Sequence, residues 1–348
     1  MTSDGYADVV MPVRVDPAGV AGPTPGQARG RRWRRVGKGL YVPADVDPAP
    51  TRQRIAEAVR GTGGAATGWA ALHWLGATWF NGVRGDGLTP QAVPIALDDR
   101  RQARARPGVA LSEDWLFDDD VIVVGGLRVT IPERAVTYEV RRAWHLAGAV
   151  RTIDMAAFDD LVDIEGLTAY TERLVARGGV RLLRQALTRA DENVWSPPEV
   201  DMRIEWEHTG RAGSLLCNVP LFDLSGRHLL TPDLFDPVHA VAGEYNGAVH
   251  DGVAPRRRDL DREELYRRHG IESLWMMSAD NRDTTRFVRR LHAAYDRADG
   301  RPGAPTWTLT QPDWWVDTST VAARRALTPD QRARWLRRQN PKPLTCGS

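Results

Sequence analysis

The chain has 348 residues, of which 42% are apolar and 26% are charged, and its formal net charge is only +2. This is an ordinary globular composition, and the small net charge excludes a globally basic nucleic-acid binder. No run of about 18 apolar residues predicts a membrane span, and no basic stretch followed by an apolar one predicts secretion. The two cysteines, Cys217 and Cys346, form neither a disulfide framework nor a zinc pattern. A cytoplasmic location is therefore predicted.

The N-terminal part combines a leader with a basic segment. Residues 1–28 are rich in Gly, Pro and Asp, which is typical of a flexible leader. Residues 29–92 begin with "RGRRWRRVGK", in which six of ten residues are basic, and two short strands are expected around the turn Gly37-Lys38-Gly39. Helices are expected over residues 51–61 and over "GWAALHWLG", where Thr67 can serve as the N-cap.

The middle region, residues 93–190, is predicted to mix strands and helices. It begins with alternating strands, the last of which, "VIVVGGLRVTI", contains a Gly-Gly turn. One continuous helix is expected over residues 132–162, with Pro132 at its entry. Two further helices are expected to be joined at Gly178-Gly179.

Residues 191–297 have the clearest order of elements. A helix opens at "SPPEVDMRIEW", where Ser196 is the candidate N-cap, Pro197 takes the first helical position and Glu199 completes a capping box. Three strands follow, then the basic helix "RRRDLDREELYRRHG", the strand "IESLWMM" and a last helix. The order α-β-β-β-α-β-α predicts an α/β domain of the α+β type.

The tail, residues 298–348, is rich in tryptophan and arginine. Trp307, Trp314 and Trp315 lie close together in a polar stretch, and such rings usually attach a tail to the surface of a domain. The alternative is that they stack on nucleic-acid bases.

Two acidic residues are expected to converge within the sheet of residues 191–297. Glu244 and Asn246 alternate along one strand and therefore share a face. If an even-numbered loop is centred near Pro237 and Val238, Asp233 lies on that same face, diagonal to Glu244 at about 7–8 Å. Two converging carboxylates stay ionised together only with a cation between them, and oxygen ligands of this kind suit Mg²⁺ or Mn²⁺. The alternatives are that Asp233 serves a turn and that Glu199 serves its cap alone.

Residues 196–296 resemble a restriction-endonuclease-like domain of the PD-(D/E)xK superfamily, and in particular the small bacterial domains related to very-short-patch repair endonucleases. The resemblance is carried by "SPPEVDMR", "NVPLFDLSGRHLLTPDLFDP", "GEYNGAVH", "RRRDLDREELYRRHG" and "IESLWMMSAD". It implies metal ligands at Asp233 and Glu244, with Glu199 as an optional helix ligand. It also implies substrate-facing and core-bracing roles for His250, Arg258, Asp259 and Arg262.

Asn246 departs from the pattern of this family, which has lysine there, or aspartate in the nearer relatives. An asparagine can ligate a metal through its carbonyl oxygen, but it adds no charge and cannot act as a base. The candidate catalytic residues are Asp233, Glu244, Asn246 and His250. Two functions stay open, a metal-dependent DNA nuclease and a catalytically inactive DNA-binding regulator that retains the nuclease fold.

The N-terminal segment "RRWRRVGKGLYVP" resembles antitoxin and regulator proteins of abortive-infection, type IV toxin–antitoxin systems. In that family a winged-helix module ends in a basic strand pair of the form R-(I/V)-x-x-G-x-Y, which Arg35, Val36, Gly39 and Tyr41 match. The resemblance implies DNA as a partner, and a toxin or other defence-system protein as a further one. The alternative is a solvated hairpin that packs on the middle region. The residues predicted to contact DNA, including two from the later basic helix, are Arg31, Arg32, Arg34, Arg35, Lys38, Arg258 and Arg262.

Overall fold

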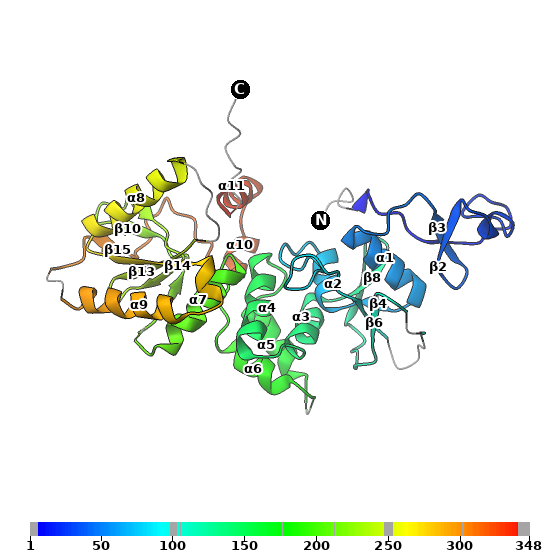
Figure 1. Cartoon of the computed structure of the whole chain (residues 1–348), viewed down its shortest axis with the longest axis horizontal. Helices are drawn as coiled ribbons and strands as arrows, with labels where there is room; N and C mark the ends of the chain where they lie inside the picture. Colours follow the sequence, from blue (N-terminus) through cyan, green and yellow to red (C-terminus); the bar gives the residue numbers. More distant parts are fainter. Residues whose placement is uncertain are drawn as a thin grey trace, which may run out of the picture. The chain divides into compact units, whose positions relative to one another are not determined.

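The computed structural model is an α+β protein, as predicted, with mixed and antiparallel sheets (Figure 1). The chain divides into an N-terminal unit, Met1–Trp144 with Gly166–Leu183, and a C-terminal unit, His145–Glu165 with Arg184–Ser348. The structure describes residues 6–97, 103–104, 106–175, 177–211, 213–246, 253–300 and 303–339, with the backbone alone for residues 253–259 and 338–339. This division differs from the five consecutive segments expected from the sequence.

The N-terminal unit is built on a five-stranded sheet in the order β6-β5-β4-β8-β7. Its strands are β4 (Ala65–Ala66), β5 (Val93–Ala96), β6 (Val109–Ser112), β7 (Val121–Val124) and β8 (Leu127–Thr130). The helices α1 (Thr51–Thr62), α2 (Gly68–Trp74) and α3 (Pro132–Val140) pack on one another or on this sheet. The predicted Gly-Gly turn joins β7 to β8, where Gly125 and Gly126 adopt φ values of 56° and 74°. Only glycine adopts two such values in succession without strain.

The basic hairpin forms a separate three-stranded sheet in the order β1-β3-β2. Its strands are β1 (Val13–Arg14), β2 (Trp33–Gly37) and β3 (Leu40–Pro43), and the predicted turn contains Gly39 at φ 69°. Part of the predicted leader, residues 6–28, is described by the structure and contributes a strand to this sheet. There, β1 pairs with β3, and the carboxylate of Asp16 accepts the backbone N–H groups of Ala18, Val20 and Ala21.

The single helix expected over residues 132–162 is two helices, α3 and α4 (Leu146–Phe158). The break has a local cause, because His145 is extended and its Nδ1 accepts the N–H of Gly148 at 3.0 Å, which starts a new helix. Trp144 is 100% exposed at this point, and the chain leaves the N-terminal unit here. The later helices α5 (Ile164–Glu172) and α6 (Val180–Leu187) flank Gly178-Gly179 as predicted.

The C-terminal unit has a four-stranded sheet in the order β14-β13-β12-β9, with α8 on one face and α7 and α9 on the other (Figure 1). The helices are α7 (Pro197–His208), α8 (Val253–Arg268) and α9 (Thr285–Ala298), and α4 packs on α7. The strands are β9 (Leu216–Cys217), β12 (Leu234–Asp236), β13 (Val241–Asn246) and β14 (Glu272–Met277). The predicted succession of helices and strands holds in outline.

A small second sheet in this unit, in the order β11-β10-β15, was not expected. Its strands are β10 (Leu221–Asp223), β11 (His228–Leu230) and β15 (Trp307–Thr308). Pro232 separates β11 from β12, since proline cannot donate to a ladder and one long strand cannot continue through it. Trp307 packs on Phe235 with ring centroids 5.0 Å apart, which confirms that the tail attaches to the domain.

The register between β12 and β13 differs from the expected one by two residues. Leu234 pairs with Gly243, so the ladder places Asp233 opposite Glu244 rather than diagonal to it. The loop is longer because Asp236 Oδ1 accepts the N–H of Val238 at 2.9 Å and Ala240 takes a left-handed φ of 56°. A shift of two residues keeps the face unchanged and brings the two carboxylates closer together.

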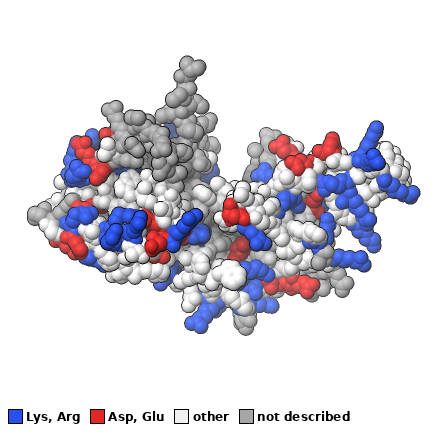
Figure 2. Space-filling model, viewed as in Figure 1, with Lys and Arg blue, Asp and Glu red and all other residues white. Residues whose placement is uncertain are grey.

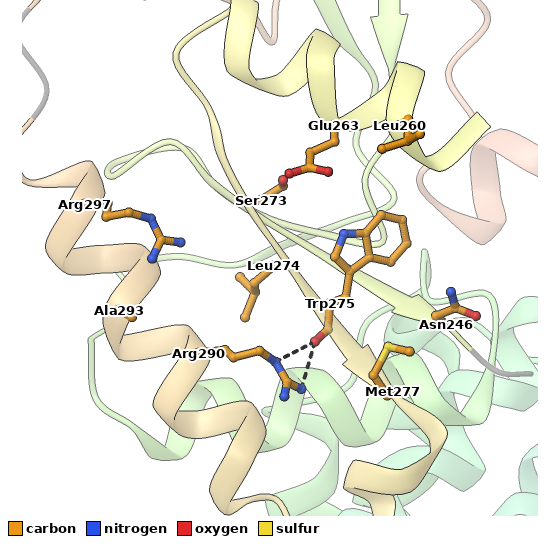
Figure 3. A pocket seen from close by; sticks show the side chains of 10 residues that line it. All are labelled: Asn246, Leu260, Glu263, Ser273, Leu274, Trp275, Met277, Arg290, Ala293 and Arg297. Atoms are coloured by element: carbon orange, nitrogen blue, oxygen red, sulfur yellow. Dashed lines mark hydrogen bonds between the residues drawn. The ribbon is translucent and has the colours of Figure 1, made fainter. Parts of the chain in front are cut away.

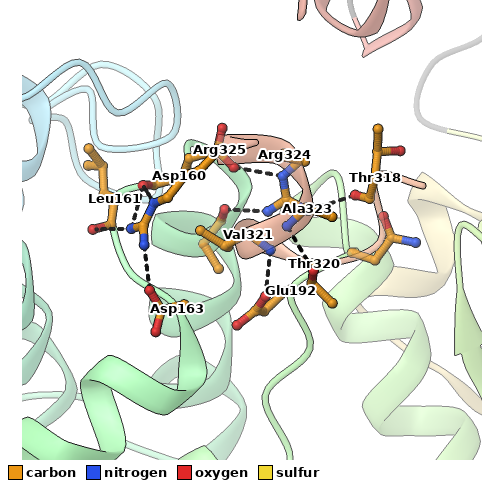
Figure 4. A network of polar contacts seen from close by, with 12 residues as sticks. Asp160, Leu161, Asp163, Glu192, Thr318, Thr320, Val321, Ala323, Arg324 and Arg325 are labelled. Atoms are coloured by element: carbon orange, nitrogen blue, oxygen red, sulfur yellow. Dashed lines mark hydrogen bonds and ion pairs between the residues drawn. The ribbon is translucent and has the colours of Figure 1, made fainter. Parts of the chain in front are cut away.

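The rest of the tail forms α10 (Val321–Arg325) and α11 (Pro329–Gln339), held by an ion-pair network (Figure 4). Arg324 is only 1% exposed, and its Nε lies 2.7 Å from Asp160 Oδ1. Arg332 contacts the other oxygen of Asp160 at 2.7 Å, and Arg325 contacts Asp163 at 2.5 Å. We refer to these five side chains as the arginine staple. The staple fixes the tail within the C-terminal unit.

Candidate functional site

Glu199 lies in the first turn of α7, but it does not complete the capping box that the sequence predicts. Its Oε2 accepts the N–H of Trp195 at 2.9 Å, and its Oε1 accepts the hydroxyl of Ser196 at 2.7 Å. Ser196 therefore bonds to the glutamate instead of capping the helix backbone. The side chain of Glu199 points back toward Trp195, four residues earlier in the chain. Its carboxylate is therefore buried at the start of α7.

Asn218, which sequence reasoning did not single out, holds Glu199 from the other side. It is 3% exposed, and its Nδ2 donates to Glu199 Oε2 at 2.9 Å. Its own N–H donates to the carbonyl of Asp233 at 3.0 Å, which links the end of β9 to the Pro-Asp segment. Asn218 has a φ of 47°, a left-handed value that asparagine tolerates better than most residues. An asparagine in "NVP" is the sole sequence signal for it, and that signal is weak.

Asp233 and Glu244 face each other across the β12–β13 pairing. Asp233 Oδ2 accepts the N–H of Tyr245 at 2.7 Å. Glu244 is 5% exposed, and its Oε1 accepts hydrogen bonds from Arg262 Nε at 2.8 Å, from Arg262 Nη2 at 2.5 Å and from the Tyr266 hydroxyl. The two donors on α8 thus fix the position of Glu244.

The three carboxylates influence one another electrostatically. Burial first, and then the nearby charge of Asp233, raise the pKa of Glu199 to about 7 and the pKa of Glu244 to about 8. Burial also raises the pKa of Asp233, which the Tyr245 hydrogen bond and Arg262 oppose. Arg262 bonds to Glu244 and lowers the pKa of Asp233, whereas the described donors to Glu199 are uncharged. The three acids therefore share little positive charge, and the raised pKa values mean that they ionise together only at a cost. We refer to Glu199, Asp233 and Glu244 as the carboxylate cluster.

The carboxylate cluster fits a divalent cation in charge but offers few ligands. Within the part of the chain that the structure describes, no three His, Cys, Asp or Glu side chains are placed to hold a metal ion. Glu199 already accepts three hydrogen bonds, which leaves Asp233 and Glu244 as the pair with a free oxygen each among the described contacts. One or two carboxylates, with waters and a substrate phosphate, are the usual ligands of Mg²⁺.

Asn246 ends β13 on the same face as Glu244, as the alternation predicts, but it lines a different space (Figure 3). This is a groove of about 640 Å³ along the edge strand β14, between α8 and α9. Its floor includes Trp275, whose carbonyl accepts Arg290 Nη2 at 3.0 Å. His250 and the side chains of Arg258 and Asp259 lie outside the described residues.

The structure separates the predicted DNA-contacting residues into exposed and internally bonded ones. Arg262 is bonded to Glu244 and to the carbonyl of Thr231, which fits the bracing role that the resemblance implies, and its contact with DNA stays a prediction. Arg34 forms a bidentate pair with Glu57 on α1, at 2.7 Å for both bonds, and its contact with DNA also stays a prediction. The exposed members of the set are Arg31, Arg32, Arg35 and Lys38.

Two further basic residues, which sequence reasoning missed, join the hairpin. A pocket of about 770 Å³ is lined by Arg35, Lys38, Arg104 and Arg106, and the described residues of its lining include no acid. Arg106 Nη2 donates to the carbonyl of Val36. Figure 2 shows lysine and arginine side chains gathered over the hairpin end of the N-terminal unit. The basic run "RRQARAR" was the signal that could have identified this surface.

Known proteins provide no assignment for this site. No family model matches the chain, and no match is found among curated proteins or solved structures. In the described ranges, no helix is long and apolar enough to cross a membrane.

Proposed function

We propose that the C-terminal unit is a metal-dependent phosphodiesterase that acts on DNA, with a restriction-endonuclease-like arrangement of its elements. The observation that carries this proposal is the carboxylate cluster, in which Asp233 and Glu244 face each other across β12 and β13, and burial, followed by the charge of Asp233, raises the pKa of both Glu199 and Glu244. Stability alone does not require three acids buried side by side, because such groups ionise only at a cost in folding free energy. The pattern is typical of a functional site.

In this proposal Asp233 and Glu244 bind Mg²⁺ or Mn²⁺ through the oxygens that the described hydrogen bonds leave free. When bound, such an ion lowers the pKa of a water molecule and neutralises charge on the phosphate. Arg262 and Tyr266 keep Glu244 oriented, and Asn218 and Ser196 hold Glu199 behind Asp233. In this proposal Glu199 does not bind the ion, and its carboxylate contributes to the negative potential of the site.

Binding of DNA is assigned to the exposed basic hairpin of the N-terminal unit, in which a winged-helix-like or antitoxin-like role is part of the proposal. Arg31, Arg32, Arg35 and Lys38 are exposed, and Arg104 extends the surface. Such residues neutralise phosphates and release counterions, which makes binding sensitive to salt. A toxin or other defence-system partner stays a prediction.

A second candidate function is a catalytically inactive DNA-binding regulator that keeps the nuclease fold. Two observations favour it. Glu244 Oε1 already accepts three hydrogen bonds from Arg262 and Tyr266. Asn246 supplies no charge and lines the β14 groove.

The test is cleavage of plasmid, nicked and mismatched DNA with Mg²⁺ or Mn²⁺. We expect the wild type to hydrolyse a phosphodiester bond and Glu244→Gln to be about 100-fold slower or more. Substitution of a residue that only hydrogen-bonds to a metal ligand already lowers activity by about 10–100-fold, and loss of a ligand itself should cost at least as much. The matched control is Glu264→Gln, because Glu264 is an exposed α8 glutamate whose partner among the described ion pairs is Arg268.

The outcomes separate the two candidate functions. Salt-sensitive binding of DNA by both proteins without cleavage by either rejects the phosphodiesterase and leaves the regulator. Absence of binding at low salt rejects both. Equal cleavage by the wild type and Glu244→Gln places the chemistry elsewhere in the chain.

A further inference from the structure

A second pocket adjoins the carboxylate cluster within the C-terminal unit. It encloses about 170 Å³, and its lining includes Trp195, Asn218, Thr231, Trp315, Asp317 and Trp335. Two of these residues connect it to the cluster, because Asn218 donates to Glu199 at 2.9 Å and the carbonyl of Thr231 accepts Arg262 Nη2 at 2.6 Å. A ligand that contacts Asn218 or Thr231 in this pocket is therefore separated from the carboxylate cluster by a single layer of side chains.

Aromatic rings form much of the wall of this pocket. Trp195 and Trp335 meet edge to face, with centroids 5.3 Å apart and planes at 83°. Trp315 stacks on His228 with centroids 5.1 Å apart and planes at 23°, and its edge contacts Phe222. These contacts hold the rings in place, so a flat ligand would meet surfaces that need no reordering.

Two polar groups of the pocket favour a ligand that carries hydrogen-bond donors. The described residues that line the pocket include no lysine or arginine. A pocket without such a cation is unsuited to binding a phosphate. Asn218 Oδ1 accepts no hydrogen bond from the described residues, and Asp317 contributes a carboxylate. Both are acceptors, so the ligand should present N–H donors.

The arginine staple keeps the tail side of the pocket in place. Arg324 Nη1 donates to the carbonyl of Thr318 at 3.0 Å, while its Nε is paired with Asp160. Thr318 lines the pocket directly after Asp317. The segment that carries Trp315 and Asp317 is thus attached to the same unit as the carboxylates, and this gives the tryptophan-rich tail a role beyond packing.

We propose that this pocket binds one unstacked nucleobase of the DNA strand presented to the carboxylate cluster, in preference a base with an exocyclic amino group. Adenine, cytosine and guanine carry that group and thymine does not. An enzyme that acts next to a base can take it out of the stack into a pocket lined by aromatic side chains. The inference rests on the proposed action on DNA, and it adds the recognition of the substrate.

The test measures binding of short single-stranded runs of dA, dC or dT to the full chain, in EDTA and in the Glu244→Gln background. We expect dA and dC to bind roughly 10-fold more tightly than dT, and Trp315→Ala to remove roughly 10-fold of that affinity. Asp317→Asn should reduce the preference for dA and dC with less effect on dT. Trp314→Ala is the matched control, because this neighbouring ring is 58% exposed and does not line the pocket.

Each outcome decides the proposal. Equal binding of the three runs by the wild type, or equal losses in Trp314→Ala and Trp315→Ala, overturns it. Trp315→Phe, with thermal unfolding measured alongside, separates loss of stacking from loss of fold, since phenylalanine should retain most of the affinity. Base preference without cleavage rejects the phosphodiesterase alone, whereas metal-dependent cleavage without base preference rejects the pocket alone.

Discussion

The C-terminal unit contains two charged networks of opposite balance. The carboxylate cluster has three acids and one guanidinium; burial raises the pKa of all three acids, and the charge of Asp233 raises those of Glu199 and Glu244 further. The arginine staple has three guanidinium groups around Asp160 and Asp163, and both carboxylates are paired.

The difference between these networks shows how charge balance distinguishes a structural contact from a candidate site. A buried arginine with several acceptors, such as Arg324, fixes one segment to another and leaves nothing for a ligand. A buried group of acids with one guanidinium ionises only at a cost in stability, so its pKa values are raised and a bound cation would favour the ionised form. The three predictions below test this distinction, in order of decreasing effect.

The largest effect is expected from Asp160→Ala. Arg324 is 1% exposed, and Asp160 is its carboxylate partner. The substitution therefore leaves a buried guanidinium without a carboxylate. We expect the free energy of unfolding to fall by about 3–5 kcal/mol, measured by urea denaturation. In Asp163→Ala the freed Arg325 is 45% exposed, and a loss of about 1 kcal/mol or less is expected. Equal losses would contradict the structural role of the buried pair.

The second prediction concerns pH and the carboxylate cluster. Glu244 titrates near about 8 in the folded chain against 4.5 for an ordinary glutamate, so the folded state retains a proton that the unfolded state releases. The free energy of unfolding therefore falls as pH rises through this window, by up to about 1.4 kcal/mol per pH unit for each such group.

The measurement is the difference between the wild type and Glu244→Gln in denaturation series between those two pH values. The variant cannot ionise at this position, so its stability should depend less on pH. Mg²⁺ should stabilise the wild type more as pH rises, since its ligands must be deprotonated. A wild type that gains stability relative to the variant across this window would refute the assignment.

The smallest effect is expected in the hairpin, where Arg34 has an acidic partner and Lys38 has none among the described ion pairs. Lys38 is exposed and unpaired among the described ion pairs, so Lys38→Ala should lower the salt slope of duplex binding by about 0.9 for each lost phosphate contact. Arg34 is paired with Glu57, so Arg34→Ala should leave the slope unchanged and lower stability by about 1 kcal/mol or less. The reverse result would reassign the DNA-contacting face.

Tertiary partners explain most of the differences between the sequence predictions and the structure. "RRAWH" has no residue that forbids a helix, and yet the capping contact of His145 with Gly148 divides the expected helix. Arg262 and Arg34 look like free surface charges in the sequence, but each has an acid from a distant segment as its partner. Patterns along one segment do not contain such information.

The local geometry and the face of the candidate site follow from short patterns in the sequence. Gly125-Gly126 specifies a hairpin turn, Pro132 and Pro197 mark helix starts, and the period of two in β13 places Glu244 and Asn246 together. These properties depend on neighbouring residues and on the allowed backbone angles.

Which side chains meet depends on the tertiary structure. It placed Asp233 opposite Glu244, Asn218 against Glu199, and Trp315 and Trp335 in a pocket with Asn218. Register depends on how a loop bonds internally, and burial depends on which helices cover a sheet, so neither follows from the order of residues. The same packing that assembled the carboxylate cluster also raised its pKa values, because it removed the acids from water and left them a single guanidinium.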